Sequence, residues 1–135
     1  MARHLILHNN IQQIPQLAEF VDAVCEEKEL PLPMVMSLNL ALEEAVTNVI
    51  LYAYPDGTDG LVDIEATVRE NGLEFVISDT GKPFDPTAAP EADVTLGVEE
   101  RGIGGLGIFL VRKIMDTVDY RYENGKNILT MVKNI

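Results

Sequence analysis

The pattern of apolar and polar residues in the first 53 positions predicts one strand followed by two helices. Residues 3–8 predict a short opening strand. Residues 34–53 contain neither proline nor glycine before Pro55, and this run, entered through Leu32-Pro33, predicts the longest helix. Between these two segments, apolar residues at spacings of three and four predict an amphipathic helix that ends before Pro31. Those residues are Ile14, Leu17, Phe20, Val21 and Val24.

Strict alternation of apolar and polar residues marks the next two elements. Residues 62–69 alternate as a half-buried strand does, and Asn71-Gly72 then supplies a hairpin turn. In the returning strand, residues 73–79, side chains point to opposite faces in turn. Asp79 therefore points the way the core points. It shares that face with Leu73, Phe75 and Ile77.

The pattern dissolves over residues 81–101, and structureless segments of this length inside compact domains are usually functional or disordered. We interpret this segment as a mobile lid. A glycine cluster at residues 102–107 then opens a helix, and a strand pair turning at Asn124-Gly125 closes the chain. This order predicts an α+β fold, a two-layer α/β sandwich with helices packed on one face of a mixed, mainly antiparallel sheet. We expect residues 1–135 to form a single domain.

Composition narrows the classes of partner. The chain is 47% hydrophobic and 24% charged, which is typical of a globular protein. Its net charge of −12 and pI near 4.4 argue against a direct grip on nucleic acid, which needs clustered Lys and Arg. An acidic surface suits a basic protein partner, or serves solubility alone.

Cysteine use and hydropathy indicate the compartment. The single cysteine, Cys25, lies in an apolar helical pattern and has no partner for an intrachain disulfide, so we place it in the core and expect a reducing environment. The apolar run of residues 5–7 is too short for a signal peptide, and we expect no span of ~20 apolar residues for a membrane. Both observations predict a cytoplasmic protein without membrane contact.

Glu44 and Asn48 stand one helical turn apart and point within ~40° of each other. The main apolar stripe of the same helix lies about 100° round from them. Together with Ser37 and Ala41 they form a smaller-featured flank that either lines a cavity or faces solvent. The apolar stripe consists of Leu38, Leu42, Ala45, Val49 and Ala53.

Asp79 needs hydrogen-bond donors, because a buried carboxylate is costly without them. It either caps the turn at Thr80-Gly81 or accepts a hydrogen bond from a ligand amine, such as that of adenine, with Gly81 allowing the backbone to approach closely.

The glycine cluster matches G-x-G-x-x-G at residues 102–107 but has neither the preceding strand nor the later acid of a dinucleotide fingerprint. Glycines before a helix still expose backbone N–H groups at its positive end, which suits a phosphate; a flexible loop is the plain alternative. We expect no structural metal, since His4 and His8 lack companions and one cysteine cannot make a thiolate zinc site.

Taken in order, residues 44–48, 79–86 and 104–107 resemble the three boxes of the GHKL, or Bergerat, ATP-binding fold. Across residues 3–133 the chain looks like the bacterial anti-sigma-factor serine-protein kinases. The resemblance implies ATP and Mg²⁺ as cofactors, and as partners a sigma factor or similar regulator and a small antagonist protein that is phosphorylated. It also suggests a homodimer.

The resemblance further implies a role for each matching residue. Glu44 would be the general base and Asn48 would give an oxygen to Mg²⁺. Asp79 would read the adenine, for which Gly81 makes room, and Thr130 would support the adenine through water. The remaining residues would contact phosphates: Arg101, Gly104, Gly105, Leu106 and Gly107.

Two other functions stay open. The chain could be a non-catalytic binding module in which the nucleotide only orders the lid and alters partner affinity. It could also be a histidine-kinase-like ATPase domain, although no phospho-accepting histidine lies on a long helix. Lys82-Pro83 departs from the usual family pattern, and the lid is acidic, so we expect modest nucleotide affinity. The lid acids are Glu91, Asp93, Glu99 and Glu100.

Overall fold

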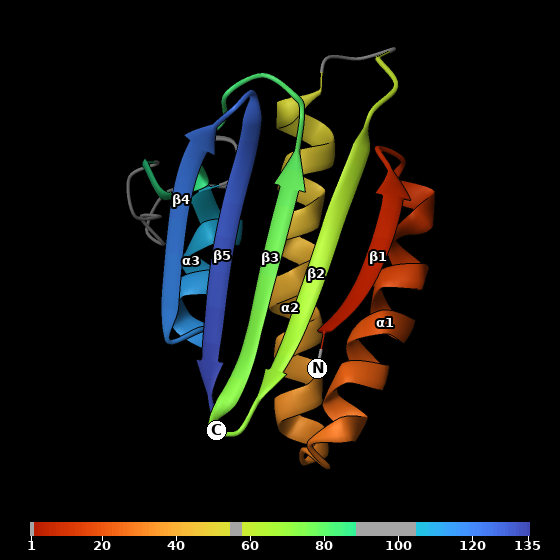
Figure 1. The fold of residues 1–135 in the computed structure, drawn as a ribbon, viewed down its shortest axis with the longest axis vertical. Helices are drawn as coiled ribbons and strands as arrows, with labels where there is room; N and C mark the ends of the chain where they lie inside the picture. The colour runs from red at the N-terminus through yellow and green to blue at the C-terminus, as the bar shows by residue number, and fades with distance from the viewer. Residues whose placement is uncertain (1, 55–57, 89–104) are drawn as a thin grey trace.

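Three helices cover one face of a five-stranded sheet in the computed structural model, which describes residues 2–54, 58–88 and 105–135 (Figure 1). The helices are α1 (Ile14–Glu27), α2 (Leu32–Asn48) and α3 (Gly105–Ile114). The strands are β1 (Ala2–His8), β2 (Leu61–Arg69), β3 (Gly72–Asp79), β4 (Thr117–Glu123) and β5 (Lys126–Asn134). The two-layer α+β sandwich predicted from the sequence is confirmed.

The sheet has the strand order β1-β2-β3-β5-β4, and every neighbouring pair among the described strands is antiparallel. The expectation of a mixed sheet was therefore wrong in that detail. Tight hairpins join β2 to β3 and β4 to β5, and a hairpin can only make an antiparallel pair. The second hairpin turns at Asn124 (φ 53°) and Gly125 (φ 77°), the left-handed pair that the Asn-Gly sequence favours.

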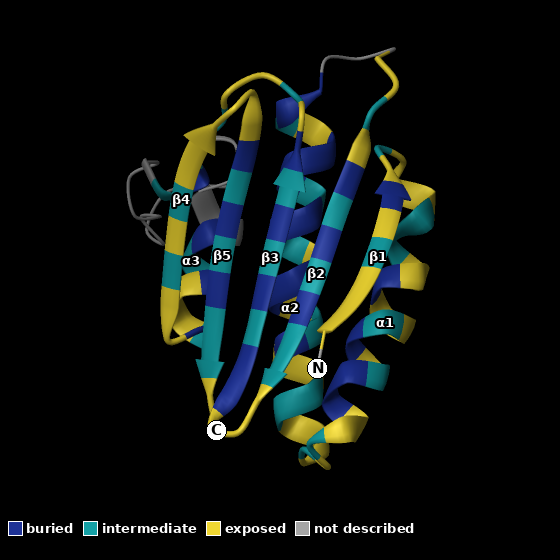
Figure 2. Ribbon diagram, viewed as in Figure 1, coloured by how far each residue is buried: buried dark blue, intermediate teal, exposed yellow. Residues whose placement is uncertain are grey.

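Burial alternates along the central strands, as Figure 2 shows for β2, β3 and β5. The inward residues of β3 are packed under α2, with Phe75 fully buried. The register places Asp79, the last residue of β3, beside Val62 of β2 on one side and Asn127 of β5 on the other. Two polar residues therefore end the core-facing rows at the same end of the sheet.

Helix α2 runs along the middle of the helical layer and continues through a π-helical turn at Val49–Ala53. The combined helix Leu32–Ala53 is long and apolar enough to cross a membrane by length and composition, which the sequence analysis did not anticipate. Of its most apolar window 44% is buried inside the fold. Its apolar content is explained by its contacts with α1 and α3 and by its buried residues, which belong to the same core cluster as those of the sheet.

Cys25 lies in the core, as expected, with 1% of its surface exposed. Burial, reinforced by the nearby negative charge of Asp22, raises the pKa of its thiol to about 11. The thiolate is therefore scarce at neutral pH, and Cys25 is a packing residue rather than a nucleophile.

Candidate functional site

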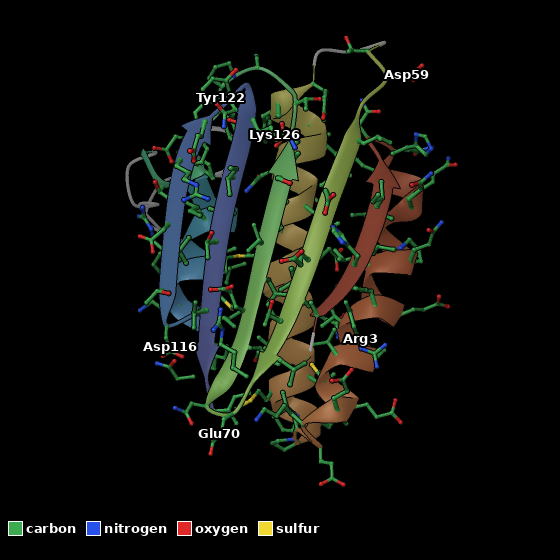
Figure 3. All side chains as sticks on the ribbon, viewed as in Figure 1. Arg3, Asp59, Glu70, Asp116, Tyr122 and Lys126 are labelled. Atoms are coloured by element: carbon green, nitrogen blue, oxygen red, sulfur yellow. The ribbon has the colours of Figure 1, made fainter. Side chains whose placement is uncertain are left out.

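A narrow pocket lies between α2 and the sheet, at the end where β3 stops. Side chains from α2, β3, β4, β5 and α3 line it, and Phe84 and Pro86 close it from the segment after β3. The free volume of this pocket is only about 10 Å³, enough for about one water molecule. In Figure 3, Tyr122 and Lys126 mark the same end of the sheet, and Glu70 and Asp116 mark the opposite end. The pocket is built but nearly closed.

Asn48 ends α2 and faces this pocket. It is 6% exposed, and its Nδ2 has no hydrogen-bond partner within the described part of the chain. An unsatisfied buried donor costs about 1–3 kcal/mol, so the site is set up to gain from an acceptor atom on a ligand. This flank of the helix was expected either to line a cavity or to face solvent, and Asn48 lines a cavity. Glu44 lies one turn earlier, is partly buried, and is not among the pocket-lining residues.

Asp79 is 4% exposed and accepts two hydrogen bonds, both on the same oxygen, Oδ1. The donors are Gly81 N at 2.8 Å and Asn127 Nδ2 at 2.9 Å. Burial raises the pKa of the Asp79 carboxyl above its ordinary value, and the bonds from Asn127 and Gly81 partly oppose that rise. The turn-capping role predicted for Asp79 is therefore present, and its second oxygen, Oδ2, accepts no hydrogen bond within the described residues.

Asn127 is the polar member of the pocket that sequence reasoning missed. It lies opposite Asp79 in the register, on the core face of β5 together with Leu129 and Met131. The sequence could have pointed to Asn127, because it is a polar residue at an inward position of an alternating strand. Its pairing with Asp79 was not available, since β3 and β5 are far apart along the chain.

Thr130, chosen from the sequence to support the same ligand, lies elsewhere. It pairs with Val76 of β3 and with Asp119 of β4, on the sheet face that carries no helices. Thr130 stands three positions after Asn127, and an odd separation along a strand reverses the face. The structure therefore does not bring Thr130 together with Asp79.

Gly81 has a packing reason that the sequence did not reveal. A Cβ built on it would lie 2.3 Å from the carbonyl oxygen of Ala53, at the end of the α2 helix. The same carbonyl accepts the N–H of Lys82 at 2.8 Å, and the hydroxyl of Tyr54 accepts the N–H of Thr80 at 3.1 Å. The end of the helix thus fixes the backbone on both sides of Gly81.

Replacing Gly81 with alanine is expected to destabilise the fold by about 1–3 kcal/mol, because the contact is with backbone that cannot move aside. Urea unfolding followed by circular dichroism measures the change. Thr80→Ala is the matched control, since the Thr80 side chain is exposed and its backbone bond to Tyr54 remains. Equal stability of the two variants would refute this account of Gly81.

The predicted phosphate-binding segment is described in part. Gly105, Leu106 and Gly107 form the first turn of α3, and Ile108 directly after them lines the pocket. The backbone at the start of α3 thus lies next to the pocket. Arg101, Gly104 and most of the predicted lid lie outside the described residues.

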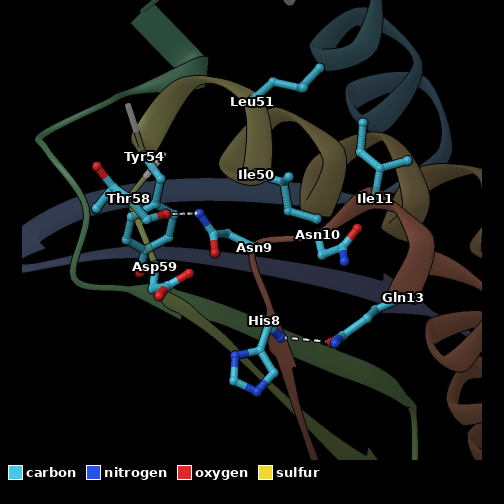
Figure 4. Close-up of a pocket in the computed structure, with 10 residues that line it drawn as sticks. All are labelled: His8, Asn9, Asn10, Ile11, Gln13, Ile50, Leu51, Tyr54, Thr58 and Asp59. Carbon is cyan, nitrogen blue, oxygen red and sulfur yellow. Dashed lines mark hydrogen bonds between the residues drawn. The ribbon is translucent and has the colours of Figure 1, made fainter. Parts of the chain in front are cut away.

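A larger pocket lies elsewhere in the described part of the chain and contains none of the predicted site residues. It measures about 670 Å³ and lies between the end of β1 and the end of the α2 helix (Figure 4). Its amides are used within the protein: Asn9 Nδ2 donates to Thr58 O, and Gln13 Oε1 accepts the N–H of His8. These bonds fix the segment after β1 and join it to Thr58 ahead of β2, so the narrow pocket is the better candidate.

Metal ligands do not cluster in the described ranges, where no group of three His, Cys, Asp or Glu side chains could hold an ion. His4 instead pairs with Asp63 on the sheet. A cation in the narrow pocket would therefore take most of its oxygens from a bound ligand and from water, which is how Mg²⁺ usually binds beside phosphates.

Fold, pocket and glycine-started helix together are those of an ATP-binding domain, and the chain belongs to the histidine kinase-like ATPase domain family, whose model matches residues 7–133. Curated relatives of this chain include serine-protein kinases RsbW. The RsbW of Listeria monocytogenes serovar 1/2a is 29% identical over 135 residues, covering 91% of this chain and 86% of the relative. The RsbW of Staphylococcus aureus is 34% identical over 101 residues, covering 71% of this chain and 63% of the relative.

Solved structures agree on the fold. The RsbU and RsbW domains of a Mycobacterium tuberculosis protein match 98% of this chain with a TM-score of 0.69 and 12% identity, and this chain spans 32% of that one. A histidine kinase domain from Erythrobacter litoralis matches 89% of this chain with a TM-score of 0.58 and 14% identity, and 59% of that chain is covered. The resemblance to the GHKL fold and to the serine-protein kinases is confirmed, and that kinship supports an anti-sigma-type kinase function.

Proposed function

We propose that this chain is an ATP- and Mg²⁺-dependent serine-protein kinase that phosphorylates a small antagonist protein and acts as an anti-sigma-type regulator. The observation that carries the proposal is the meeting of an unpartnered Asn48 amide, a buried Asp79 carboxylate and the start of α3 in one pocket. We take residues 1–135 as one functional unit.

Asp79 is proposed to bind the adenine. Its Oδ1 is held by two donors, and Oδ2 is available to accept from the exocyclic amine of the base. In Asn48 the amide oxygen would be a ligand for Mg²⁺, and the unpartnered Nδ2 would donate to a phosphate oxygen. Bound Mg²⁺ would supply charge neutralisation for the triphosphate.

Glu44 is the proposed general base. The serine hydroxyl oxygen attacks the γ-phosphorus, a new P–O bond forms, the bond between the β–γ bridging oxygen and the γ-phosphorus breaks, and ADP leaves. The hydroxyl proton passes to the Glu44 carboxylate. The backbone N–H groups of residues 104–107 at the start of α3 and the Arg101 guanidinium would stabilise the phosphates.

The surface before Glu44 suits an acceptor of protein size. Leu32, Met36 and Leu40 precede Glu44 on α2 at steps of four residues, and they are 69%, 64% and 40% exposed. Such steps place neighbours about 6 Å apart on one side of a helix. A partner that buries about 800 Å² of this protein while presenting a serine to Glu44 would cover these side chains. This exposed row favours a protein over a small molecule as phosphate acceptor.

Partners and compartment complete the proposal. We propose a sigma factor or similar regulator as the sequestered partner, a homodimer as the assembled form and the cytoplasm as the compartment. The net charge of −12 supports basic partner surfaces.

The test incubates the purified chain with γ-³²P-labelled ATP, Mg²⁺ and small antagonist proteins from the same organism, and locates phosphoserine by mass spectrometry. Transfer to a single serine that stops on omission of Mg²⁺ is the expected result. ATP binding that changes affinity for a partner without any transfer would instead identify a nucleotide-gated binding module. Phosphate on a histidine of the acceptor would identify a histidine-kinase-like domain.

A further inference from the structure

The Asn127 side chain uses its full hydrogen-bonding capacity at the pocket. Nδ2 donates to Asp79 Oδ1 at 2.9 Å and to the carbonyl oxygen of Lys82 at 2.8 Å. Oδ1 accepts the N–H of Phe84 at 2.9 Å and the hydroxyl of Tyr120 at 2.5 Å. A side-chain amide offers two donors and about two acceptor sites, so these four bonds account for all of them.

These four bonds permit one orientation of the amide. The Phe84 N–H must meet an acceptor, which places Oδ1 toward Phe84 and Nδ2 toward Asp79. A flipped amide would set its oxygen against the Asp79 carboxylate and the Lys82 carbonyl, leaving the buried carboxylate without one of its two donors. Asn127, itself 5% exposed, is therefore locked in place.

The Asn127 amide also fixes the Asp79 carboxylate. Asn127 and Gly81 both donate to Oδ1, so a turn of the carboxylate out of this plane would break both bonds. Asp79 lines the pocket, and Oδ2 makes no hydrogen bond within the described residues. Asn127 also fastens the strand-exit segment, residues 82–86, whose Phe84 and Pro86 close the pocket. One side chain thus touches both the carboxylate and the segment that covers it.

We propose that Asn127 is a positioning residue for adenine recognition: it holds the Asp79 carboxylate with Oδ2 free for the adenine amine and ties that carboxylate to the strand-exit segment. The inference rests on the proposed ATP-binding function. It assigns base selectivity to a pair, Asp79 with Asn127, and not to Asp79 alone. The ligand must be a purine whose exocyclic amine, at the position where inosine has a carbonyl, donates to Asp79 Oδ2.

Selectivity for that amine gives a readout that packing alone would not move. Inosine triphosphate (ITP) carries the same phosphates and ribose as ATP but offers Asp79 an oxygen. A hydrogen bond to a charged group contributes about 1.5–3 kcal/mol, which corresponds to roughly 10–100-fold in affinity. Tyr120, which donates to Asn127, and Tyr54, which accepts from Thr80, are retained in every variant.

The experiment is calorimetry of Mg²⁺-ATP and Mg²⁺-ITP binding to the wild type, Asn127→Leu and Asn127→Asp at one pH. Asn127→Asp keeps an acceptor for Phe84 and Tyr120 but cannot donate to Asp79 when ionised, so it stays informative if the leucine variant folds poorly. The wild type should prefer ATP by about 10-fold or more, and both variants should lose most of that preference. Asn39→Leu is the matched control, because Asn39 also donates to an aspartate, Asp22, at 2.8 Å but lies outside the pocket.

The outcomes distinguish failure of the proposed ATP-binding function from failure of the role assigned to Asn127. No ATP binding by the wild type would overturn the proposed function and this inference with it. ATP binding by the wild type without preference over ITP, or an unchanged preference in both Asn127 variants, would overturn the inference and leave the ATP site standing. Loss of preference in Asn39→Leu as well would assign the effect to general loosening of the fold.

Discussion

Replacing Glu44 with glutamine is expected to lower the rate of phosphate transfer to the protein serine by roughly 10²–10⁴-fold, the usual contribution of a general base. Glutamine keeps the size of the side chain but cannot take the hydroxyl proton. ATP binding should change little, because Glu44 is partly exposed and lies outside the pocket lining. The transfer rate is measured with labelled ATP at saturating nucleotide, and binding is measured by calorimetry.

Glu43→Gln is the matched control. Glu43 is the preceding residue of α2, is exposed, and carries the same charge, but it points away from the pocket by about 100° relative to Glu44. It should keep transfer within about threefold of the wild type. Comparable losses in both variants would indicate a general effect of negative charge on partner docking and would remove Glu44 from the base role.

Local chemistry was enough to predict most elements of the fold. The Asn124-Gly125 turn was predicted at the right residues, because few residue pairs adopt the left-handed backbone of such a two-residue turn. The first hairpin was also predicted, but its turn lies one residue earlier than Asn71-Gly72: Arg69 pairs with Gly72, so Glu70 and Asn71 form the turn. Alternation along β3 placed Asp79 on the core face, and the structure has it 4% exposed. These features depend on neighbouring residues along the chain, so a single sequence is enough to predict them.

Features that depend on distant pairing were not predictable in the same way. Asn127 meets Asp79 only because β5 inserts beside β3, and no local signal specifies that neighbour. Thr130, to which the resemblance assigned adenine support, lies on the other face of β5 from Asn127, since three positions along a strand reverse the side chain. The tight contact of Gly81 with Ala53 likewise joins segments far apart in sequence.

Asp79→Asn is expected to reduce ATP affinity by about 10–100-fold, the value of a hydrogen bond to a charged acceptor. The substitution preserves shape, and its oxygen can still accept from Gly81 and Asn127. The position of Oδ2, however, becomes an amide nitrogen that meets the adenine amine donor to donor. Calorimetry with Mg²⁺-ATP measures the loss, and unchanged affinity would remove Asp79 from adenine recognition.

The stability of the same Asp79→Asn variant should change in the opposite direction. Burial raises the pKa of Asp79 in the folded state above its ordinary value of 3.8, so the folded protein holds this proton more tightly than the unfolded chain does. The protonated Asp79 side chain therefore makes its full contribution to the free energy of unfolding below about pH 3.8. That contribution is lost as the pH rises through the folded-state pKa. Urea unfolding midpoints, compared between wild type and Asp79→Asn from pH 3 to pH 7, should shift in favour of the variant as the pH rises.

A variant that binds ATP poorly yet gains relative stability toward neutral pH is the behaviour expected of a carboxylate kept in the core for its ligand. A variant that instead loses relative stability as the pH rises would show that Asp79 is ionised there for the benefit of the fold.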